Sequence, residues 1–350
     1  MLASIPAELA KNGGWISFAR YMELALHAPG GYYAGGARKF GAEGDFVTAP
    51  ELGRLFGRTL SRQLKELLNE NRRILEIGAG SGALAETLLD ELGCEYFILE
   101  TSADLRDRQR ERLGSRAVWL ESLPEGFRGA IVANEVVDAI PVHAVAWRAQ
   151  GIMERGVAAD GDKLFWKDRP ASGALLEEAK KISPGLPYES EIGLIGQAWM
   201  RRVAESLQQG VAFIIDYGFP RHEYYHPQRA EGTLMCHHRH RAHGDVFARP
   251  GLEDMTAHVD FSALAGAART AGLEVLGYAT QAQFLVNCGI TDVLGEANVE
   301  NALHYAPLAA EANKLLSPAE MGELFKVLAV GRGVKAPLLG FTRGNRAATL

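Results

Sequence analysis

The sequence predicts an α/β fold in which a mostly parallel sheet carries helices on both faces. Two observations lead to this prediction. From Arg72 onward short apolar runs alternate with amphipathic segments, and a glycine-rich turn joins the first apolar run to the next helix. Such alternation is typical of parallel sheets, because parallel strands need long crossover connections. The 350 residues suffice for one large domain with additions or for two domains.

The expected elements fall into two parts of the chain. Residues 1–70 are an N-terminal arm and lid, in which a loop-rich stretch precedes a helix after Pro50. Residues 71–350 are the main domain, with a β-rich insertion at about 142–170 and a polar loop at about 217–258. The expected strands of this domain are RRILEI, YFILE, AVWL, AIVAN and VAFIID, with two late strands near 273–278 and 325–330; the expected helices start near Gly82 and cover 103–113, 191–208 and 261–271.

The composition argues against several classes of protein. The 37 basic and 43 acidic residues give a net charge of −6, which disfavours nucleic-acid binding through an overall positive field. The sequence shows no run of about 18 apolar residues and no basic leader followed by an apolar run. The three cysteines are far apart and form no CxxC pair, which disfavours disulfides. We therefore expect a cytoplasmic protein with reduced thiols, no membrane insertion and no nucleic-acid partner.

The strongest motif is LEIGAGSGA at residues 75–83, between a predicted strand and a predicted helix. Glycines let the backbone turn sharply and approach a ligand closely. The motif satisfies the dinucleotide pattern GxGxxG/A, and Glu100 lies where an acid would bind ribose hydroxyls. Glu76 favours S-adenosylmethionine instead, because a carboxylate there would repel a diphosphate but attract a cationic cofactor. A nicotinamide dinucleotide and a turn without a ligand remain as alternatives.

The motif EIGAGSG and five longer stretches resemble the signature blocks of the MidA-like family of class I methyltransferases, relatives of a mitochondrial complex I assembly factor that methylates an arginine. The stretches are FARYMELALHAPGGYY, GDFVTAPELGRLFG, ANEVVDAIPVH, FIIDYGFPRHEYYHPQRAEGTL and PGLEDMTAHVDF. This resemblance spans residues 18 to about 261. It implies a class I Rossmann-like fold, dependence on S-adenosylmethionine and methylation of an arginine in a partner protein of the respiratory complex I type. The cofactor-binding residues that we expect are Glu76, Gly78, Ala79, Gly80, Gly82, Glu100, Thr101 and Asn134.

Three polar residues lie at or just after the end of the fourth expected strand, at the edge where open α/β sheets bind ligands. Asn134, Glu135 and Asp138 are therefore our catalytic candidates for contact with the methyl acceptor. A carboxylate can hold a planar guanidinium through two parallel hydrogen bonds, so Glu135 is the first candidate for this clamp and Asp138 the second. The alternative is that Asn134 or Asp138 caps a following helix.

The stretch GAEGDFVTAP, residues 41–50, has neither a helical nor a strand period. We expect a lid over the cofactor, in which the glycines are hinges and Phe46 is an apolar cover. Asp45 would reach the cofactor or the acceptor, and Thr48 would lie on the substrate side. The alternative is a static turn in which Asp45 and Thr48 cap the helix after Pro50.

Further substrate-side candidates lie later in the chain. Asp216 and Tyr217 end the fifth expected strand, and His258 could pair with Asp260, although Asp260 is also a candidate N-cap. The histidines of HHRHRAH, residues 237–243, match no standard zinc spacing and alternate with arginines, so we expect a basic loop and no metal site. Four tyrosines either wall an acceptor channel or pack in loops: Tyr32, Tyr33, Tyr224 and Tyr225.

The leading interpretation is an S-adenosylmethionine-dependent methyltransferase that acts on arginine in a partner protein. Three alternatives remain: transfer to another nitrogen or oxygen acceptor, a nicotinamide oxidoreductase, and an assembly factor that binds the cofactor but transfers no methyl group. The N-terminal arm and the β-rich insertion are candidate surfaces for a partner or for a homodimer.

Overall fold

The central sheet confirms the predicted α/β architecture. The computed structural model describes residues 2–34, 48–68, 72–238, 241–298, 300–335 and 337–350. The strand order is β15-β16-β10-β5-β2-β3-β4, with β14 beside β10. The pairs along β4-β3-β2-β5-β10 are parallel, whereas β16 is antiparallel to both of its neighbours. The bounds are β2 Arg73–Ile77, β3 Glu95–Leu99, β4 Val118–Leu120, β5 Phe127–Asn134, β10 Leu207–Phe219, β14 Val259–Asp260, β15 Glu274–Thr280 and β16 Phe325–Arg332.

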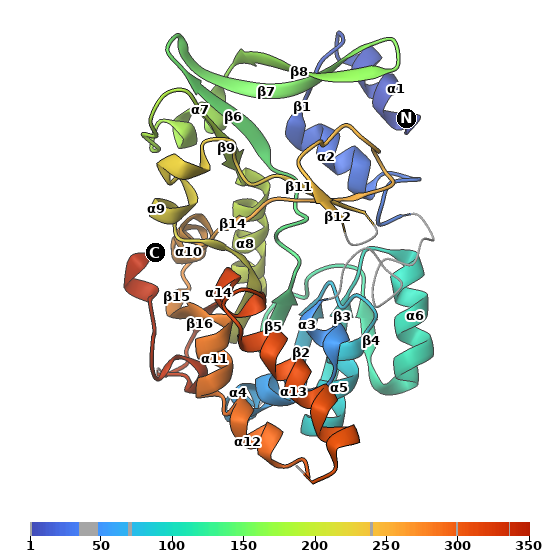
Figure 1. Cartoon of the computed structure of the whole chain (residues 1–350), viewed down its shortest axis with the longest axis vertical. Helices are drawn as coiled ribbons and strands as arrows, with labels where there is room; N and C mark the ends of the chain where they lie inside the picture. Colours follow the sequence, from blue (N-terminus) through green and yellow to red (C-terminus); the bar gives the residue numbers. More distant parts are fainter. Residues whose placement is uncertain (1, 35–47, 69–71, 239–240, 299, 336) are drawn as a thin grey trace.

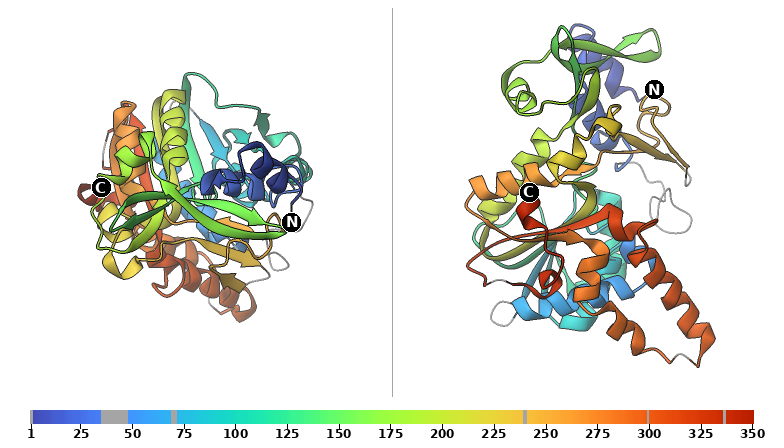
Figure 2. Two further views of the ribbon diagram at one scale, coloured as in Figure 1. Left: turned by 90° about the horizontal axis from the view of Figure 1, so that it is seen from above. Right: turned by 60° about the vertical axis from the view of Figure 1, so that its left-hand side comes forward.

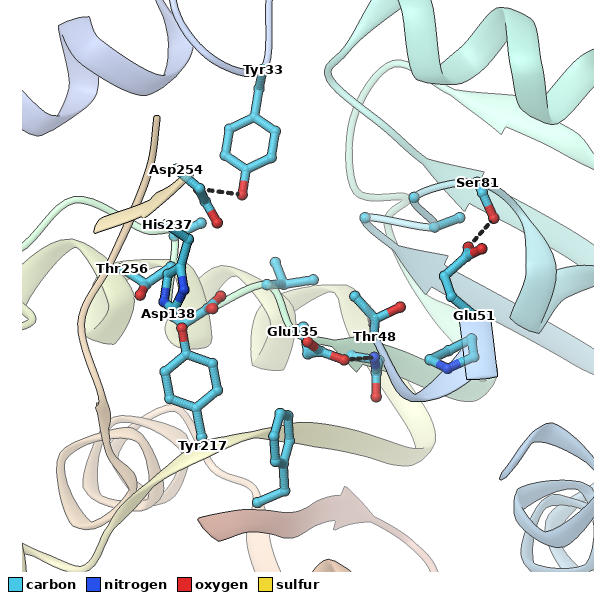
Figure 3. Close-up of a pocket in the computed structure, with 18 of the residues that line it drawn as sticks. Tyr33, Thr48, Glu51, Ser81, Glu135, Asp138, Tyr217, His237, Asp254 and Thr256 are labelled. Atoms are coloured by element: carbon cyan, nitrogen blue, oxygen red, sulfur yellow. Dashed lines mark hydrogen bonds between the residues drawn. The ribbon is translucent and has the colours of Figure 1, made fainter. Parts of the chain in front are cut away.

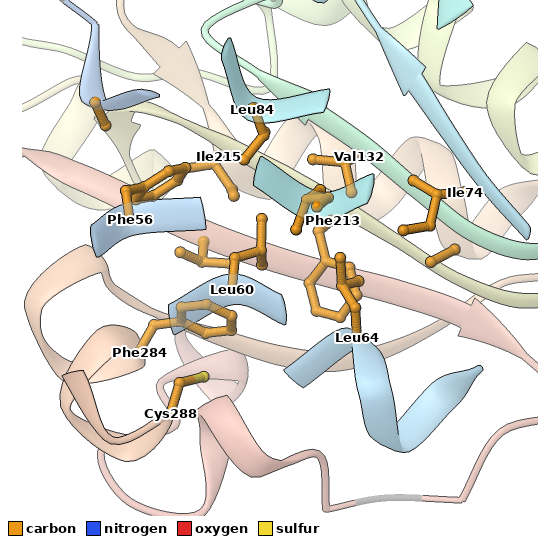
Figure 4. Packing of buried hydrophobic residues seen from close by; sticks show 14 of the residues in the cluster. Phe56, Leu60, Leu64, Ile74, Leu84, Val132, Phe213, Ile215, Phe284 and Cys288 are labelled. Atoms are coloured by element: carbon orange, nitrogen blue, oxygen red, sulfur yellow. The ribbon is translucent and has the colours of Figure 1, made fainter. Parts of the chain in front are cut away.

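Helices cover both faces of this sheet, as predicted (Figure 1). On one face, Phe56, Leu60 and Leu64 of α4 pack on Val132 and Phe213 of the sheet, and side chains of α5 and α11–α13 complete the same cluster (Figure 4). On the other face, α8 and α10 pack on the opposite sides of the same strands. The bounds are α4 Leu55–Leu67, α5 Ala83–Leu92, α6 Ala103–Leu113, α8 Leu194–Ser206, α10 Phe261–Thr270, α11 Gln281–Asn287, α12 Ile290–Gly295, α13 Ala302–Leu316 and α14 Met321–Leu324.

A second sheet lies at the other end of the molecule, against the N-terminal helices (Figures 1 and 2). Its order is β1-β7-β6-β9, and β8 pairs with β7. The insertion expected at about 142–170 supplies β6 to β8, while β1 and β9 extend the sheet beyond that range. Apolar side chains of α1 and α2 bury its inner face. The bounds are α1 Ser4–Lys11, β1 Ile16–Ser17, α2 Phe18–His27, α3 Ala49–Leu52, β6 His143–Arg148, β7 Gly151–Asp160, β8 Lys163–Pro170, α7 Gly173–Ala179 and β9 Tyr188–Ile192.

The segment 217–258 differs from the polar loop that the sequence predicts. It contains α9 (Arg221–Tyr224) and a small antiparallel sheet of order β12-β11-β13. The bounds are β11 Met235–His238, β12 Arg241–His243 and β13 Asp254–Thr256. The arm is hydrogen-bonded to this segment: the hydroxyl of Tyr21 in α2 donates to the carbonyl of Val246 at 2.5 Å. Residues remote in sequence thus meet above the central sheet.

Candidate active site

A cavity of about 540 Å³ lies at the carboxyl ends of β2, β3, β5 and β10 (Figure 3). The loops after β2, β3 and β5 form one wall. Tyr33 of the arm and Asp254 of β13 belong to the opposite wall. The cavity therefore lies at the sheet edge where parallel α/β folds bind ligands.

The glycine turn after β2 shapes the cofactor side of the cavity. Gly78 and Gly80 have φ angles of 68° and 54°, a left-handed region that favours glycine. A Cβ on Gly78 would lie 2.8 Å from Cγ2 of Val136. The Gly78 N–H donates to the Leu99 carbonyl at 2.9 Å, so the turn is bonded to the end of β3. Gly78, Ala79 and Gly80 line the cavity, whereas Gly82 is the N-cap of α5 and does not.

Two carboxylates of this wall fit a cationic nucleoside. Glu76 lies at the end of β2, accepts a hydrogen bond from the Tyr96 hydroxyl at 2.7 Å, and has a pKa raised by burial to about 7. Glu100 follows β3, and its oxygens accept from the Ser102 N–H at 3.0 Å and from the Gln109 amide at 3.2 Å. Thr101 is exposed beside it and also lines the cavity. The structure thus brings the predicted cofactor residues of β2 and β3 together.

Glu135 is held in an unusual backbone conformation after β5. Its φ of 54° is the only positive φ of a non-glycine residue in the described part of the chain. Its N–H donates to the Ile215 carbonyl at 2.8 Å. Its Oε1 accepts from the Asn134 amide at 3.1 Å and from the Ala49 N–H at 3.3 Å. Burial, together with the charge of Asp138, raises the pKa of Glu135 to about 8.

Asp138 faces the same cavity, and Asp216 supports its loop from behind. Asp138 is 7% exposed, and its Oδ1 lacks a hydrogen-bond partner among the described residues. Burial raises its pKa, while the phenol of Tyr217, which points toward it, favours the ionised form (Figure 3). No helix begins between residues 134 and 142, so neither Asn134 nor Asp138 is a helix cap.

Asp216 and Asp260 differ from the substrate-side positions that the sequence predicts. Asp216 is completely buried, and its Oδ2 accepts from three successive N–H groups, those of residues 136–138, at 2.9 to 3.2 Å. Asp260 is the N-cap of α10, where its Oδ1 accepts from the Ala263 N–H at 3.0 Å and its Oδ2 pairs with Arg221 at 3.2 Å. Neither lines the cavity. Both carboxylates therefore bind local structure: Asp216 binds backbone N–H groups, and Asp260 binds one backbone N–H and Arg221.

The other predicted substrate-side residues have mixed outcomes. Tyr217 and His258 line the cavity, with their rings 5.2 Å apart edge to face. Thr48 lines it too and precedes α3, but its side chain makes no capping hydrogen bond. Asp45 and Phe46 lie outside the described residues.

The histidine segment forms a hairpin with a side-chain network. Cys236, His243 and Glu253 bring ligand-type atoms within 4.8 Å of one another. The oxygens of Glu253 face His243 at 3.1 Å and Arg249 at 3.3 Å. Burial raises the pKa of the Cys236 thiol to about 12. Arg249 and Glu253 therefore form an ion pair, and the neutral Cys236 thiol lies close to Glu253.

Charge is distributed very unevenly around the cavity. Its described lining contains six carboxylates and neither lysine nor arginine. The carboxylates are Glu51, Glu76, Glu100, Glu135, Asp138 and Asp254. Burial lowers the pKa of His27, and it lowers that of His258 to about 4, so these two lining imidazoles are neutral near pH 7. A cavity of this composition favours cations and disfavours a diphosphate.

Sequence reasoning missed Glu51 and Asp254 and left Tyr33 undecided. Glu51 lies in α3 and accepts a hydrogen bond from the hydroxyl of Ser81 in the glycine turn. Asp254 precedes His258 by four residues in the stretch PGLEDMTAHVDF, so an acid so near a candidate was the available signal. Nothing in the sequence indicates that Tyr33 would bond to Asp254, because 220 residues separate them.

The fold and the site together define a methyltransferase of class I. The model of a family of S-adenosyl-L-methionine-dependent methyltransferases matches residues 55–279, and the chain belongs to this family. A protein from Burkholderia thailandensis, crystallised with S-adenosyl-homocysteine, has 51% identity and a TM-score of 0.96 over 100% of this chain and 96% of its own.

Relatives with assigned names agree with this membership. The mitochondrial protein arginine methyltransferase NDUFAF7 of Danio rerio is 30% identical over 91% of this chain and 83% of its own. The Drosophila melanogaster homologue is 28% identical over 94% and 86%. The resemblance to the MidA-like family is thereby confirmed, and so is S-adenosylmethionine as the cofactor.

The expected location of the protein needs correction. The expected cytoplasmic location is contradicted by these relatives, which are named mitochondrial proteins. That expectation rested on cysteine usage and on leader patterns, which do not distinguish one reducing compartment from another. In the described part of the chain no helix is both long and apolar enough to span a membrane.

Proposed function

We propose that this methyltransferase acts on arginine side chains of a partner protein. The observation that carries the proposal is the cavity wall of six carboxylates without lysine or arginine among its described residues. Glu76 and Glu100 suit the cationic cofactor, and of the remaining four acids Glu135 and Asp138 are the ones that we assign to the acceptor. The names of the relatives support the same acceptor. By the family resemblance the partner is a subunit of the respiratory complex I type.

In this proposal Glu135 binds the guanidinium and Asp138 accepts a proton. When bound, the cofactor supplies an electrophilic methyl carbon. Glu135, fixed by Asn134 and by the backbone after Thr48, accepts two parallel hydrogen bonds from the guanidinium and leaves one nitrogen facing the cofactor. Asp138 has an oxygen without a described partner, and this oxygen accepts the proton that the methylated nitrogen releases.

The test is capture of the partner with labelled S-adenosylmethionine, followed by mass spectrometry. We expect label on an arginine with the wild type, and a rate at least about 30-fold lower with Glu135→Gln, because loss of one member of a buried charge pair costs about 2–5 kcal/mol. Affinity for S-adenosyl-homocysteine should change less than twofold. The control is Glu121→Gln, whose side chain is 79% exposed. Label on lysine or on an oxygen would reassign the acceptor, and binding without transfer would indicate a silent assembly factor.

A further inference from the structure

A third carboxylate faces the acceptor side of the cavity from a different part of the chain. Asp254 lies in β13, is 2% exposed, and lines the same cavity as Glu135 and Asp138. Figure 3 shows its carboxylate on the same side of the cavity as Asp138, away from the glycine turn with Ser81. The charge of Asp254 contributes to the raised pKa of Glu135. The three carboxylates therefore line one cavity, and the charge of Asp254 acts on Glu135 within it.

The orientation of Asp254 depends on the N-terminal arm. The Tyr33 hydroxyl donates to Asp254 Oδ1 at 2.9 Å, and the Met255 N–H donates to the same oxygen at 3.0 Å. Tyr33 is itself fixed, because its N–H donates to the Leu26 carbonyl at 2.8 Å and its ring stacks on His27 at 5.5 Å. A residue of the arm thus sets the position of a carboxylate that lies about 220 residues later.

The chemistry of a guanidinium makes use of such a second anion. The group has five N–H donors in one plane, and a carboxylate clamp on one edge leaves donors on the other edges. We propose that Asp254 binds the cationic acceptor on an edge that Glu135 does not occupy, and that Tyr33 is the residue that positions Asp254. The inference rests on the proposed function and deepens it. It makes the N-terminal arm part of the acceptor site.

The experiment uses the full chain saturated with S-adenosyl-homocysteine and three short probes. These are acetyl-Gly-Arg-Gly-amide and the same peptide with citrulline or lysine in place of arginine. Citrulline has nearly the shape of arginine but no charge. Calorimetry gives the dissociation constants for the wild type, for Asp254→Asn, for Tyr33→Phe and for the double variant. Tyr224→Phe is the matched control, because its hydroxyl also donates to a buried carboxylate, Glu191, outside the cavity.

We expect Asp254→Asn to weaken binding of the arginine peptide about tenfold or more and to leave the citrulline peptide and S-adenosyl-homocysteine within twofold. Tyr33→Phe should give a smaller loss, and the double variant should match Asp254→Asn, because Tyr33 acts through Asp254. Tyr224→Phe should bind as the wild type. With the captured partner as substrate, the loss should fall on KM more than on kcat.

Two results would overturn the inference: an unchanged ratio of arginine to citrulline binding in Asp254→Asn, or losses from the two single variants that add fully. A wild type that prefers the lysine peptide, or that treats all three probes alike, would instead overturn the proposed arginine specificity. The two failures are therefore distinguishable.

Discussion

Glu135 combines a strained backbone with a defined set of contacts. A left-handed conformation costs a non-glycine residue about 1–2 kcal/mol, and such strain persists only where surrounding contacts fix it. Here the backbone N–H of Glu135 donates to a carbonyl of β10, and its side chain accepts hydrogen bonds from the Asn134 amide and the Ala49 N–H. Strain of this kind gathers at functional sites, and the position of Glu135 at the carboxyl end of β5 supports a role in acceptor binding.

The raised pKa of Glu135 predicts how activity depends on pH. Burial raises this pKa to about 8, so the carboxyl group is mostly neutral at pH 7 in the free enzyme. If the ionised form grips the acceptor, kcat/KM should rise about tenfold per pH unit below pH 8 and level off above it, since kcat/KM reports free-enzyme groups. The measurement is a pH profile with the captured partner as substrate.

The same profile in Glu135→Gln provides the control for this prediction. The variant should lose the limb near pH 8, because the amide does not titrate. A profile that falls with rising pH between 6 and 8, or a limb that survives in the variant, would contradict the assignment of the limb to Glu135.

Site residues were predictable from the sequence where they lie at the carboxyl end of a predicted strand. Glu76, Glu100 and Glu135 each follow or end a predicted parallel strand, and the sheet brings such positions to one edge. Asp216 also ends a strand, yet its side chain turns to three backbone donors. The direction in which a side chain points depends on tertiary contacts, so sequence position alone does not separate a ligand-facing acid from a supporting one.

The glycine turn and helix α5 provide a test with an internal control. Gly80 precedes the helix and Gly93 follows it, and both have φ of 54°. Valine is strained in this conformation at either site, so both variants should lose stability, by about 1–2 kcal/mol. Gly80 lines the cavity, whereas a Cβ on Gly93 would meet nothing within 4 Å.

We therefore expect Gly80→Val to abolish binding of S-adenosyl-homocysteine and Gly93→Val to retain it. Calorimetry gives the affinities, and thermal unfolding with and without the ligand shows whether the ligand still stabilises each variant. Equal affinity in the two variants would remove the glycine turn from the cofactor site.

Elements with a clear period were predictable, whereas elements with a narrow polar face, buried polar residues or an internal proline were not. The helix at 103–113 and the strands β2, β3 and β5 match the sequence-based expectations closely. Helix α2 buries seven of its ten residues, so its polar face is narrow and consists of Arg20, Glu23 and His27. Strand β9 buries Ser190 and Glu191, and such polar residues do not predict a buried strand. Helix α13 contains Pro307, which usually interrupts a helix.

At the scale of the whole molecule, the cavity is lined by residues that lie far apart in the sequence. The central sheet supplies the cofactor wall and Glu135, while the arm and the segment 233–258 supply the opposite wall. These contacts bury several carboxylates, and a carboxylate buried away from cations binds protons more tightly than in the unfolded chain. The free energy of unfolding should therefore depend on pH through the buried carboxylates of the cavity.

The sign of this dependence follows from proton counting. Between pH 6.5 and 8 the unfolded carboxylates are ionised, whereas Glu76 and Glu135 retain protons up to about pH 7 and 8. The native state then binds more protons, so the free energy of unfolding should fall as pH rises, by up to about 1.4 kcal/mol per pH unit and group. His258, with its pKa lowered to about 4, and His27, whose pKa is also lowered, oppose this slope mainly below about pH 7. Lys326, with its pKa lowered to about 8, opposes it only near and above pH 8.

Urea unfolding of the cofactor-free protein at several pH values from 6.5 to 8 measures this slope. Glu135→Gln removes one titrating group, so its free energy of unfolding should fall less steeply than that of the wild type. The variant Glu121→Gln should keep the slope of the wild type, because this side chain is 79% exposed and lies outside the cavity. A wild type that becomes more stable across this range, or a Glu135→Gln variant with an unchanged slope, would show that Glu135 is ionised in the folded apo protein. The acceptor would then meet a preformed anion, and the limb of kcat/KM expected near pH 8 would have to come from another group.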